Sequence, residues 1–139
     1  MSLSNENANK HIFATFLLRG NGLDPHYVSS SLGITPSKSF KRGEWRTETE
    51  KWTRNLWSLT SQNVIQSDNI SVHIEWILNQ LEPVNNKIIE ILERNSIESE
   101  ISCFWIFPTE HEEFELSPEL MKKIAFLGVK LSFDIYSSD

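Results

Sequence analysis

Apolar residues form several runs along the chain in patterns typical of β-strands. HIFATFLL (11–18) is apolar at nearly every position and predicts a strand covered on both faces. NLWSLTS (55–61) predicts a short strand. A longer strand is predicted from Ile97 onward, with one face made by Ile101, Cys103, Trp105 and Phe107 and the other by Phe104 and Ile106. Near the C-terminus, an alternating pattern predicts a half-buried strand whose apolar face holds Val129, Leu131, Phe133 and Ile135.

Helical patterns lie between these strands. LDPHYVSSSLG (23–33) predicts a short helix with Asp24 as its N-cap, Pro25 at its first position and Leu32-Gly33 at its end. A longer amphipathic helix, capped by Ser67 or Asp68, is predicted by the spacing of Ile70, Ile74, Ile77, Leu78 and Leu81. Pro83 interrupts this pattern, and a second helix then carries Val84, Ile88, Ile91 and Leu92 and ends near Asn95.

Two segments resemble each other. LDPHYVSSSLGI (23–34) and LSPELMKKIAFLGV (116–129) each hold a leucine, a capping residue, a proline, a short helix and Leu-Gly, and each follows an apolar strand. We therefore expect helices 24–32 and 117–127 to occupy equivalent places in an α+β, ferredoxin-like sandwich of two approximate strand-helix-strand halves with an inserted helical pair. Chance is the alternative, because capped helices often start with proline and stop with glycine.

Several short motifs along the chain resemble a known family. They are an apolar strand, LDP, LGI-TPS, KRGE, a W-S-L strand and a closing LSPEL followed by LGVKLSFDIY. Together, over roughly residues 11 to 136, they resemble the bacterial domain-of-unknown-function family numbered 4279. The resemblance implies a compact single-domain bacterial protein, and it supplies no reaction or catalytic residues to carry over.

Length and composition favour one globular domain. At 139 residues the chain can bury a full core, and we expect a single α+β domain over 11–136 after a flexible N-terminus, 1–10. The lone Cys103 excludes an intramolecular disulfide and, in its apolar run, is expected to be a buried structural thiol. No segment has the pattern of a signal peptide or a membrane span, which predicts a cytoplasmic protein with no membrane contact.

No catalytic motif is present in the sequence. The four histidines are scattered, no HExxH, phosphate-binding glycine loop or GxSxG motif occurs, and we expect a protein that is not an enzyme and has no metal or cofactor. The acidic cluster EHEEFE (110–115) has two readings. It could bind a hard cation, but it lacks the spacing and turn glycine of a calcium loop. We favour a solvated turn before the helix that begins near Ser117.

The segment 38–54 differs from the rest of the chain in charge. Its six basic residues and three glutamates give a local charge of +3, whereas the remaining residues carry −9 of the total of −6. Trp45 and Trp52 lie within it and Trp57 just beyond it. One interpretation is structural: Trp57 belongs to the core, while Trp45 and Trp52 hold a long loop on an acidic body through packing and cation–π contacts.

The other interpretations make this segment a working surface. Interleaved cations and aromatic rings also suit a groove for single-stranded nucleic acid, but the three glutamates and the acidic balance of the chain argue against it. A partner protein or small anionic ligand fits better, and the candidate binding residues are Lys41, Arg42, Trp45 and Arg46. Trp45 is then expected to be more exposed than Trp57.

These observations lead to one functional hypothesis and one alternative. The first is a non-catalytic protein-interaction domain of the immunity or regulatory type, which recognises an unidentified protein partner. The alternative is a small-molecule or anion-binding regulatory domain, by analogy with other ferredoxin-like pairs. The identity of the partner and the oligomeric state are left open by the sequence.

Overall fold

The structure is a computed structural model that describes residues 11–94, 97–107 and 113–137. The expected flexible N-terminus, 1–10, lies outside the described residues, as do residues 110–112 of the acidic cluster. Along the chain the elements are β1 (Ile12–Gly20), α2 (Pro25–Leu32), β2 (Lys38–Phe40), β3 (Asn55–Thr60), α3 (Ile70–Leu81), a 3-10 turn (Glu82–Val84), α4 (Asn85–Leu92), β4 (Glu98–Phe107), α5 (Pro118–Leu127) and β5 (Lys130–Ser137).

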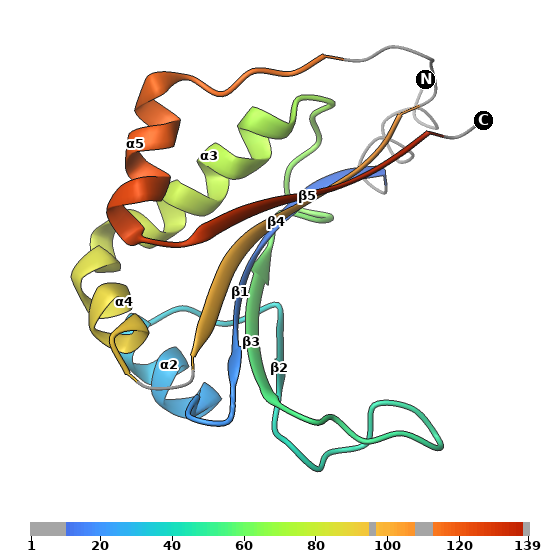
Figure 1. Ribbon diagram of the computed structural model, residues 1–139, viewed down its shortest axis with the longest axis vertical. Coiled ribbons are helices and arrows are strands. Elements are labelled where there is room, and N and C mark those ends of the chain that lie inside the picture. The colour runs from blue at the N-terminus through green and yellow to red at the C-terminus, as the bar shows by residue number, and fades with distance from the viewer. Residues whose placement is uncertain (1–10, 95–96, 108–112, 138–139) are drawn as a thin grey trace.

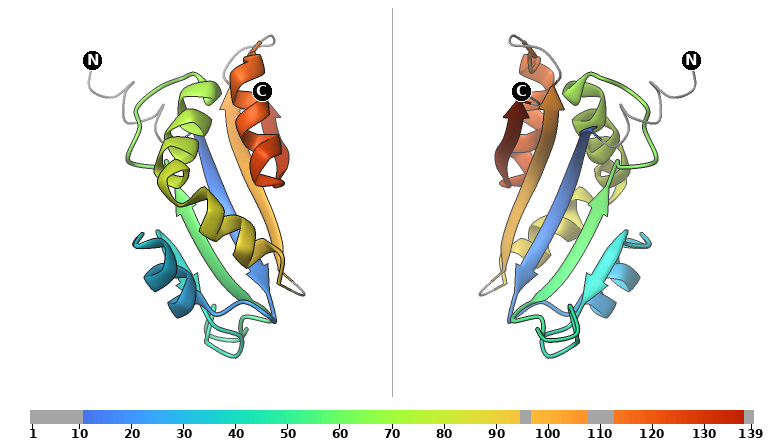
Figure 2. Two further views of the ribbon diagram at one scale, coloured as in Figure 1. Left: turned by 90° about the vertical axis from the view of Figure 1, so that its left-hand side faces the viewer. Right: turned by 90° about the vertical axis from the view of Figure 1, so that its right-hand side faces the viewer.

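The strands form one five-stranded sheet in the order β2-β3-β1-β4-β5. β1 is antiparallel to both β3 and β4, β2 is antiparallel to β3, and β4 and β5 are parallel. The helices all lie on one face of this sheet, and we call the opposite face the open face (Figures 1 and 2). The protein therefore has an α+β fold of two layers, as the sequence predicts at this coarse level.

The prediction that β1 is covered on both faces is wrong. Its residues alternate between buried and half-buried, and Ala14, Phe16 and Leu18 of the buried set face the helices. Phe13 is on the open face, where its ring stacks on Phe104 of β4 with centroids 5.1 Å apart. β1 is apolar on both faces because neighbouring side chains of the same sheet, and not a second layer of helices, partly cover its open face.

The predicted caps of the two proline-started helices are confirmed. The Asp24 carboxylate accepts hydrogen bonds from backbone N–H groups of the first turn of α2, and Ser117 accepts one at the start of α5. Each helix ends at a glycine with φ near +70°, Gly33 or Gly128. The cap of α3 is Asn69 rather than Ser67 or Asp68, because the Ser67 hydroxyl instead accepts from the Asn69 N–H in the turn before the helix.

The two strand-helix-strand units differ in their return strands. In β4-α5-β5 the return strand pairs directly with the first strand. In β1-α2-β2 the return strand lies one place further away, with β3 between β1 and β2. The helices α2 and α5 therefore each follow a strand and cover the same face of the sheet, but the two units differ in the place of the return strand (Figure 1). The short β2 is a strand that the sequence does not predict, because KSF is too short to show a period.

The last strand is less buried than its alternating pattern predicts. Val129 and Leu131 reach the core, but Phe133 and Ile135 are 39% and 43% exposed. Figure 1 shows the reason: β5 begins beside α5 and continues past the end of the helix layer. The strand therefore presents apolar side chains to solvent over its second half.

Candidate functional site

Residues 41–54 form an arm that connects β2 to β3 and projects from one end of the sheet (Figure 1). The residues from Lys41 to Lys51 are all exposed. Backbone hydrogen bonds join the two sides of the arm, from Gly43 N–H to Trp52 O (2.9 Å) and from Trp52 N–H to Glu44 O (2.8 Å). The arm is therefore a hairpin-like projection with its own hydrogen bonding.

The base of the arm is fastened to the sheet by three different contacts. The Trp52 ring stacks on Phe40 of β2, with centroids 4.3 Å apart. The Arg42 N–H donates to the Asn55 side chain at 2.6 Å, and Arg54 forms an ion pair with Glu98 of β4. These contacts hold the arm in a defined direction, so that its exposed side chains are presented by a rigid support.

The four candidate binding residues, Lys41, Arg42, Trp45 and Arg46, all lie on the arm. Trp45 is 64% exposed, with the Lys51 ammonium 4.7 Å from its ring centroid. Within the part of the chain that the structure describes, none of the three cations forms an ion pair with a carboxylate. The Glu44 side chain instead accepts a hydrogen bond from the Lys41 backbone N–H at 2.6 Å.

The structural interpretation holds for Trp57 and Trp52 but not for Trp45. Trp57 is fully buried, meets Phe16 edge-on and donates its indole N–H to the Ser29 hydroxyl at 3.0 Å. Trp52 is the anchor just described, with the Arg46 guanidinium 5.0 Å from its ring centroid. Trp45 does neither, because the cation–π contact of its ring is with Lys51 of the same arm. The prediction that Trp45 is more exposed than Trp57 is confirmed.

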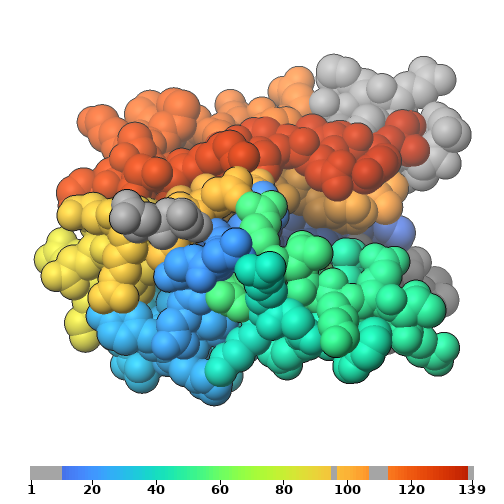
Figure 3. All heavy atoms as spheres, turned by 60° about the horizontal axis from the view of Figure 1, so that its bottom comes forward, coloured from blue at the N-terminus to red at the C-terminus, as the bar shows by residue number. Residues whose placement is uncertain are grey.

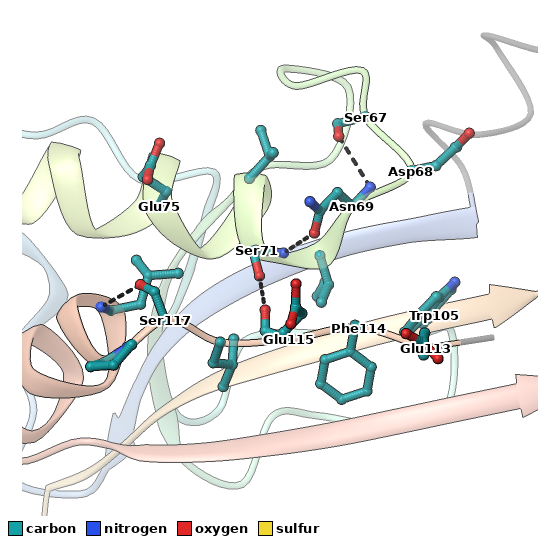
Figure 4. A pocket seen from close by; sticks show the side chains of 15 residues that line it. Ser67, Asp68, Asn69, Ser71, Glu75, Trp105, Glu113, Phe114, Glu115 and Ser117 are labelled. Carbon is teal, nitrogen blue, oxygen red and sulfur yellow. Dashed lines mark hydrogen bonds between the residues drawn. The ribbon is translucent and has the colours of Figure 1, made fainter.

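A second candidate lies at the opposite end of the molecule, where a hollow of about 940 Å³ opens beside the first turns of α3 and α5 (Figure 4). Its walls carry the carboxylates of Asp68, Glu75, Glu113 and Glu115 around an apolar floor that includes Trp105. The Ser71 hydroxyl donates to the Glu115 backbone carbonyl and so joins the two walls. The electrostatics of the hollow suit a cation and oppose an anion.

The sequence does not reveal this hollow. Its lining comes from residues 67–75, from Trp105 and from 113–120, which are separated along the chain and meet only through the packing of α3 and α5 against β4. The acidic residues of 113–115 are visible in the sequence, but nothing local pairs them with Asp68 and Glu75.

A buried serine and a buried histidine form a short hydrogen bond within the core. The Ser61 hydroxyl lies 2.6 Å from Nδ1 of His73, and Nε2 of His73 lies 2.9 Å from the Ser67 carbonyl oxygen. Because a carbonyl only accepts, Nε2 carries the proton and Nδ1 accepts from Ser61. Ser61 Oγ accepts in turn from the Ala14 N–H at 2.9 Å. Burial lowers the pKa of His73, which therefore stays neutral. Through Ser61, the His73 ring connects α3 to β1 of the sheet.

The thiol of Cys103 lies in the core of the protein. Cys103 is fully buried, and this burial raises its pKa to about 12, which fits the expected structural thiol. Among the described residues, no group of three or more histidine, cysteine, aspartate or glutamate side chains is placed to hold a metal ion. None of the helices in the described ranges is both long and apolar enough to cross a membrane.

Comparison with known proteins places this chain in a family. The model of the family described as "Domain of unknown function (DUF4279)" matches residues 9–138, which is nearly the whole chain. The protein therefore belongs to this family. A search of the curated proteins and a search of the solved structures found no match.

Proposed function

We propose that this protein is a non-catalytic interaction domain that recognises an acidic partner protein through the arm. One observation carries the proposal: an exposed tryptophan, Trp45, is presented beside the cations Lys41, Arg42 and Arg46 on a supported projection. Trp45 is 64% exposed, so its ring is available to a partner. Tryptophan and arginine are also the residues that most often contribute a large share of binding energy in protein interfaces.

The charges of the arm support the choice of an acidic partner. Among the described residues, the guanidinium groups of Arg42 and Arg46 form no ion pair, and each can bind a carboxylate through two parallel hydrogen bonds. Outside residues 38–54 the chain carries a net charge of −9, so that the field steers an acidic partner toward the arm. Figure 3 shows the arm, in teal and green, on the flank of the molecule opposite the red β5, where no other element covers it.

The scaffold is consistent with this role. We propose that β1-α2-β2-β3-α3-β4 is a ferredoxin-like sandwich, in which the order β2-β3-β1-β4 is extended by α5 and β5. The arm then lies in the β2–β3 connection, where its length can vary without disturbing the core. A small interaction domain of this kind fits an immunity or regulatory protein, and a toxin gene next to its own gene would favour the immunity role.

The proposal is tested with an arm variant and a matched control. The Arg42→Ala, Arg46→Ala double variant removes two cations from the arm, whereas Lys122→Ala, Lys123→Ala removes two from α5. The wild type and both variants serve as baits in lysate of the source organism, and captured proteins are quantified. Partners held by the wild type and the control, but lost from the arm variant, are purified and titrated by calorimetry.

We expect the arm variant to bind such a partner at least roughly 30-fold more weakly, which corresponds to about 2 kcal/mol. The control variant should bind as the wild type does. Equal affinity of the arm variant and the wild type, with both variants folded by circular dichroism, would show that the binding surface lies elsewhere.

The alternative function is a small-molecule or anion-binding regulatory domain. A small anion would also bind at Arg42 and Arg46, because the hollow beside α3 and α5 is acidic. Titration with inorganic pyrophosphate, followed by tryptophan fluorescence, separates the two proposals. A saturable change that is absent from the arm variant would favour the anion, and no change would favour the protein partner.

A further inference from the structure

The sheet ends on one side in a long strand with one free edge. β5 pairs with β4 along its whole length, and within the described residues no strand pairs with its other edge (Figure 2). The opposite end of the sheet is closed by β2, which has only three residues. From Lys130 to Tyr136, this edge exposes backbone N–H and carbonyl groups that could pair with another strand, and natural proteins usually shorten or shield such edges.

The side chains of β5 are also unusual for a free edge. Phe133 and Ile135 on the helix side are 39% and 43% exposed, and Tyr136 on the open face is 50% exposed. Phe114 packs against Phe133 with centroids 5.2 Å apart, and is itself 37% exposed. Exposed apolar side chains therefore extend from the core to the free edge of β5.

We propose that a second copy of the chain pairs with this edge, β5 against β5 in antiparallel orientation, with a two-fold axis through Ser132. Such a dimer has one continuous sheet, and the same surface is used on both copies. The inference concerns a different flank of the molecule from the arm and does not rest on the proposed function.

The register follows from which residues share a face. Lys130, Ser132 and Asp134 pair with Glu100, Ser102 and Phe104 and lie on the open face, whereas Leu131 and Phe133 pair with the buried Ile101 and Cys103. In a two-fold antiparallel pair, only residues of the same face can lie opposite each other. An axis at Ser132 therefore places Lys130 of each copy opposite Asp134 of the other, and Leu131 opposite Phe133.

Neighbouring registers lack this complementarity. An axis at Phe133 places Lys130 opposite Tyr136 and Asp134 opposite Ser132. An axis at Asp134 or at Lys130 places a charged residue opposite itself in the other copy, which is repulsive. The register centred on Ser132 forms two Lys–Asp pairs on the open face and two apolar pairs on the helix side.

The helix layer supports the same partner. α5 lies over the β5 end of the sheet (Figure 2) and exposes Met121 and Phe126, which are 49% and 60% accessible. A two-fold axis perpendicular to the sheet keeps both helix layers on one side of the extended sheet. The second copy therefore adds its own α5 to the same side of the extended sheet.

Charge reversal tests the pairing and its register together. Lys130→Asp makes both charged positions of β5 acidic, and Asp134→Lys makes both basic. Each variant alone places like charges opposite each other twice in its own dimer, so its dissociation constant should rise by roughly tenfold or more. An equimolar mixture of the two variants should form a heterodimer, because every charge pair across that interface is attractive. The matched control, Lys38→Asp on β2, should dimerise as the wild type does.

Sedimentation velocity measures monomer and dimer over a series of protein concentrations, up to the concentration of an NMR sample. In the mixture, one of the two variants carries a label. A concentration-dependent wild-type dimer, weaker for each single variant and recovered in the mixture, supports the proposal. A wild type that stays monomeric throughout overturns it, as do single variants that dimerise like the wild type, or a mixture without heterodimer. Because Lys130 lies opposite Glu100 within the chain, circular dichroism checks the fold of Lys130→Asp. If that variant does not fold, the dissociation constant of Asp134→Lys decides the question alone.

Discussion

The Ser61 hydroxyl joins three parts of the structure, so that its removal by Ser61→Ala is expected to be costly. The hydroxyl accepts from the Ala14 N–H of β1 and donates to Nδ1 of His73 in α3, and both Ser61 and His73 are fully buried. Alanine at this position leaves one buried donor, the Ala14 N–H, and one buried acceptor, Nδ1 of His73, without the Ser61 hydroxyl.

The magnitude follows from these two orphaned groups. Each buried, unsatisfied polar group costs about 1–3 kcal/mol, and the loss of the hydroxyl itself from the core recovers only part of that. We expect the free energy of unfolding to fall by about 2–4 kcal/mol, which for a chain of this length lowers Tm by about 10 °C. The matched control is Ser39→Ala, since Ser39 is exposed on β2 and its loss is expected to change stability by less than about 0.5 kcal/mol.

Urea unfolding followed by circular dichroism measures both variants against the wild type. A loss for Ser61→Ala as small as that for Ser39→Ala would refute the reasoning, because it would mean that the buried contacts of Ser61 contribute nothing beyond what an exposed serine does. An unchanged m-value is needed for the comparison, since it shows that the extent of unfolding is the same.

Three further predictions follow from buried side chains. Burial lowers the pKa of His73 from 6.5, so as pH falls the unfolded chain takes up a proton at a higher pH than the folded protein does. The free energy of unfolding, measured in urea, should therefore decline below pH 6.5 by at most about 1.4 kcal/mol per pH unit. His73→Gln should remove this slope. Trp57→Ala should cost about 3–5 kcal/mol in a thermal melt, and Trp45→Ala much less; equal losses, or a larger loss at Trp45, would contradict the burial of the two rings. Cys103, whose pKa burial raises to about 12, should react with a thiol reagent only after denaturation, and rapid labelling of the native protein would count against it.

The elements that the sequence predicts well are those whose determinants are local. Asp24 and Ser117 cap helices through hydrogen bonds to residues two or three positions away, and Gly33 and Gly128 end the same helices with positive φ. These interactions need no information about the rest of the fold. The exposure of Trp45 was likewise predictable, because its immediate neighbours are charged.

The errors arise where a side chain depends on a distant part of the chain. An apolar run cannot show whether Phe13 is covered by a helix or by Phe104, which is 91 positions away, since both environments favour the same residue type. Alternation in the last strand shows which side chains share a face, but the burial of Phe133 depends on where the helix layer ends. The contact between Ser61 and His73 also leaves no trace in the pattern, because serine is mostly exposed in proteins and histidine is intermediate, so that neither residue type indicates burial.

The position of β1 has a consequence for how the chain reaches its native state during synthesis. β1 is made first, yet it lies in the middle of the sheet, and Phe16 pairs with Ile101 of β4. At roughly 5–20 residues per second, the ribosome needs on the order of ten seconds to add the residues between them. During this interval the most apolar strand of the protein has one native neighbour at most. A nascent chain with this topology is therefore a natural client for a chaperone that binds extended apolar segments, and the residues of β1 are the segment it would bind.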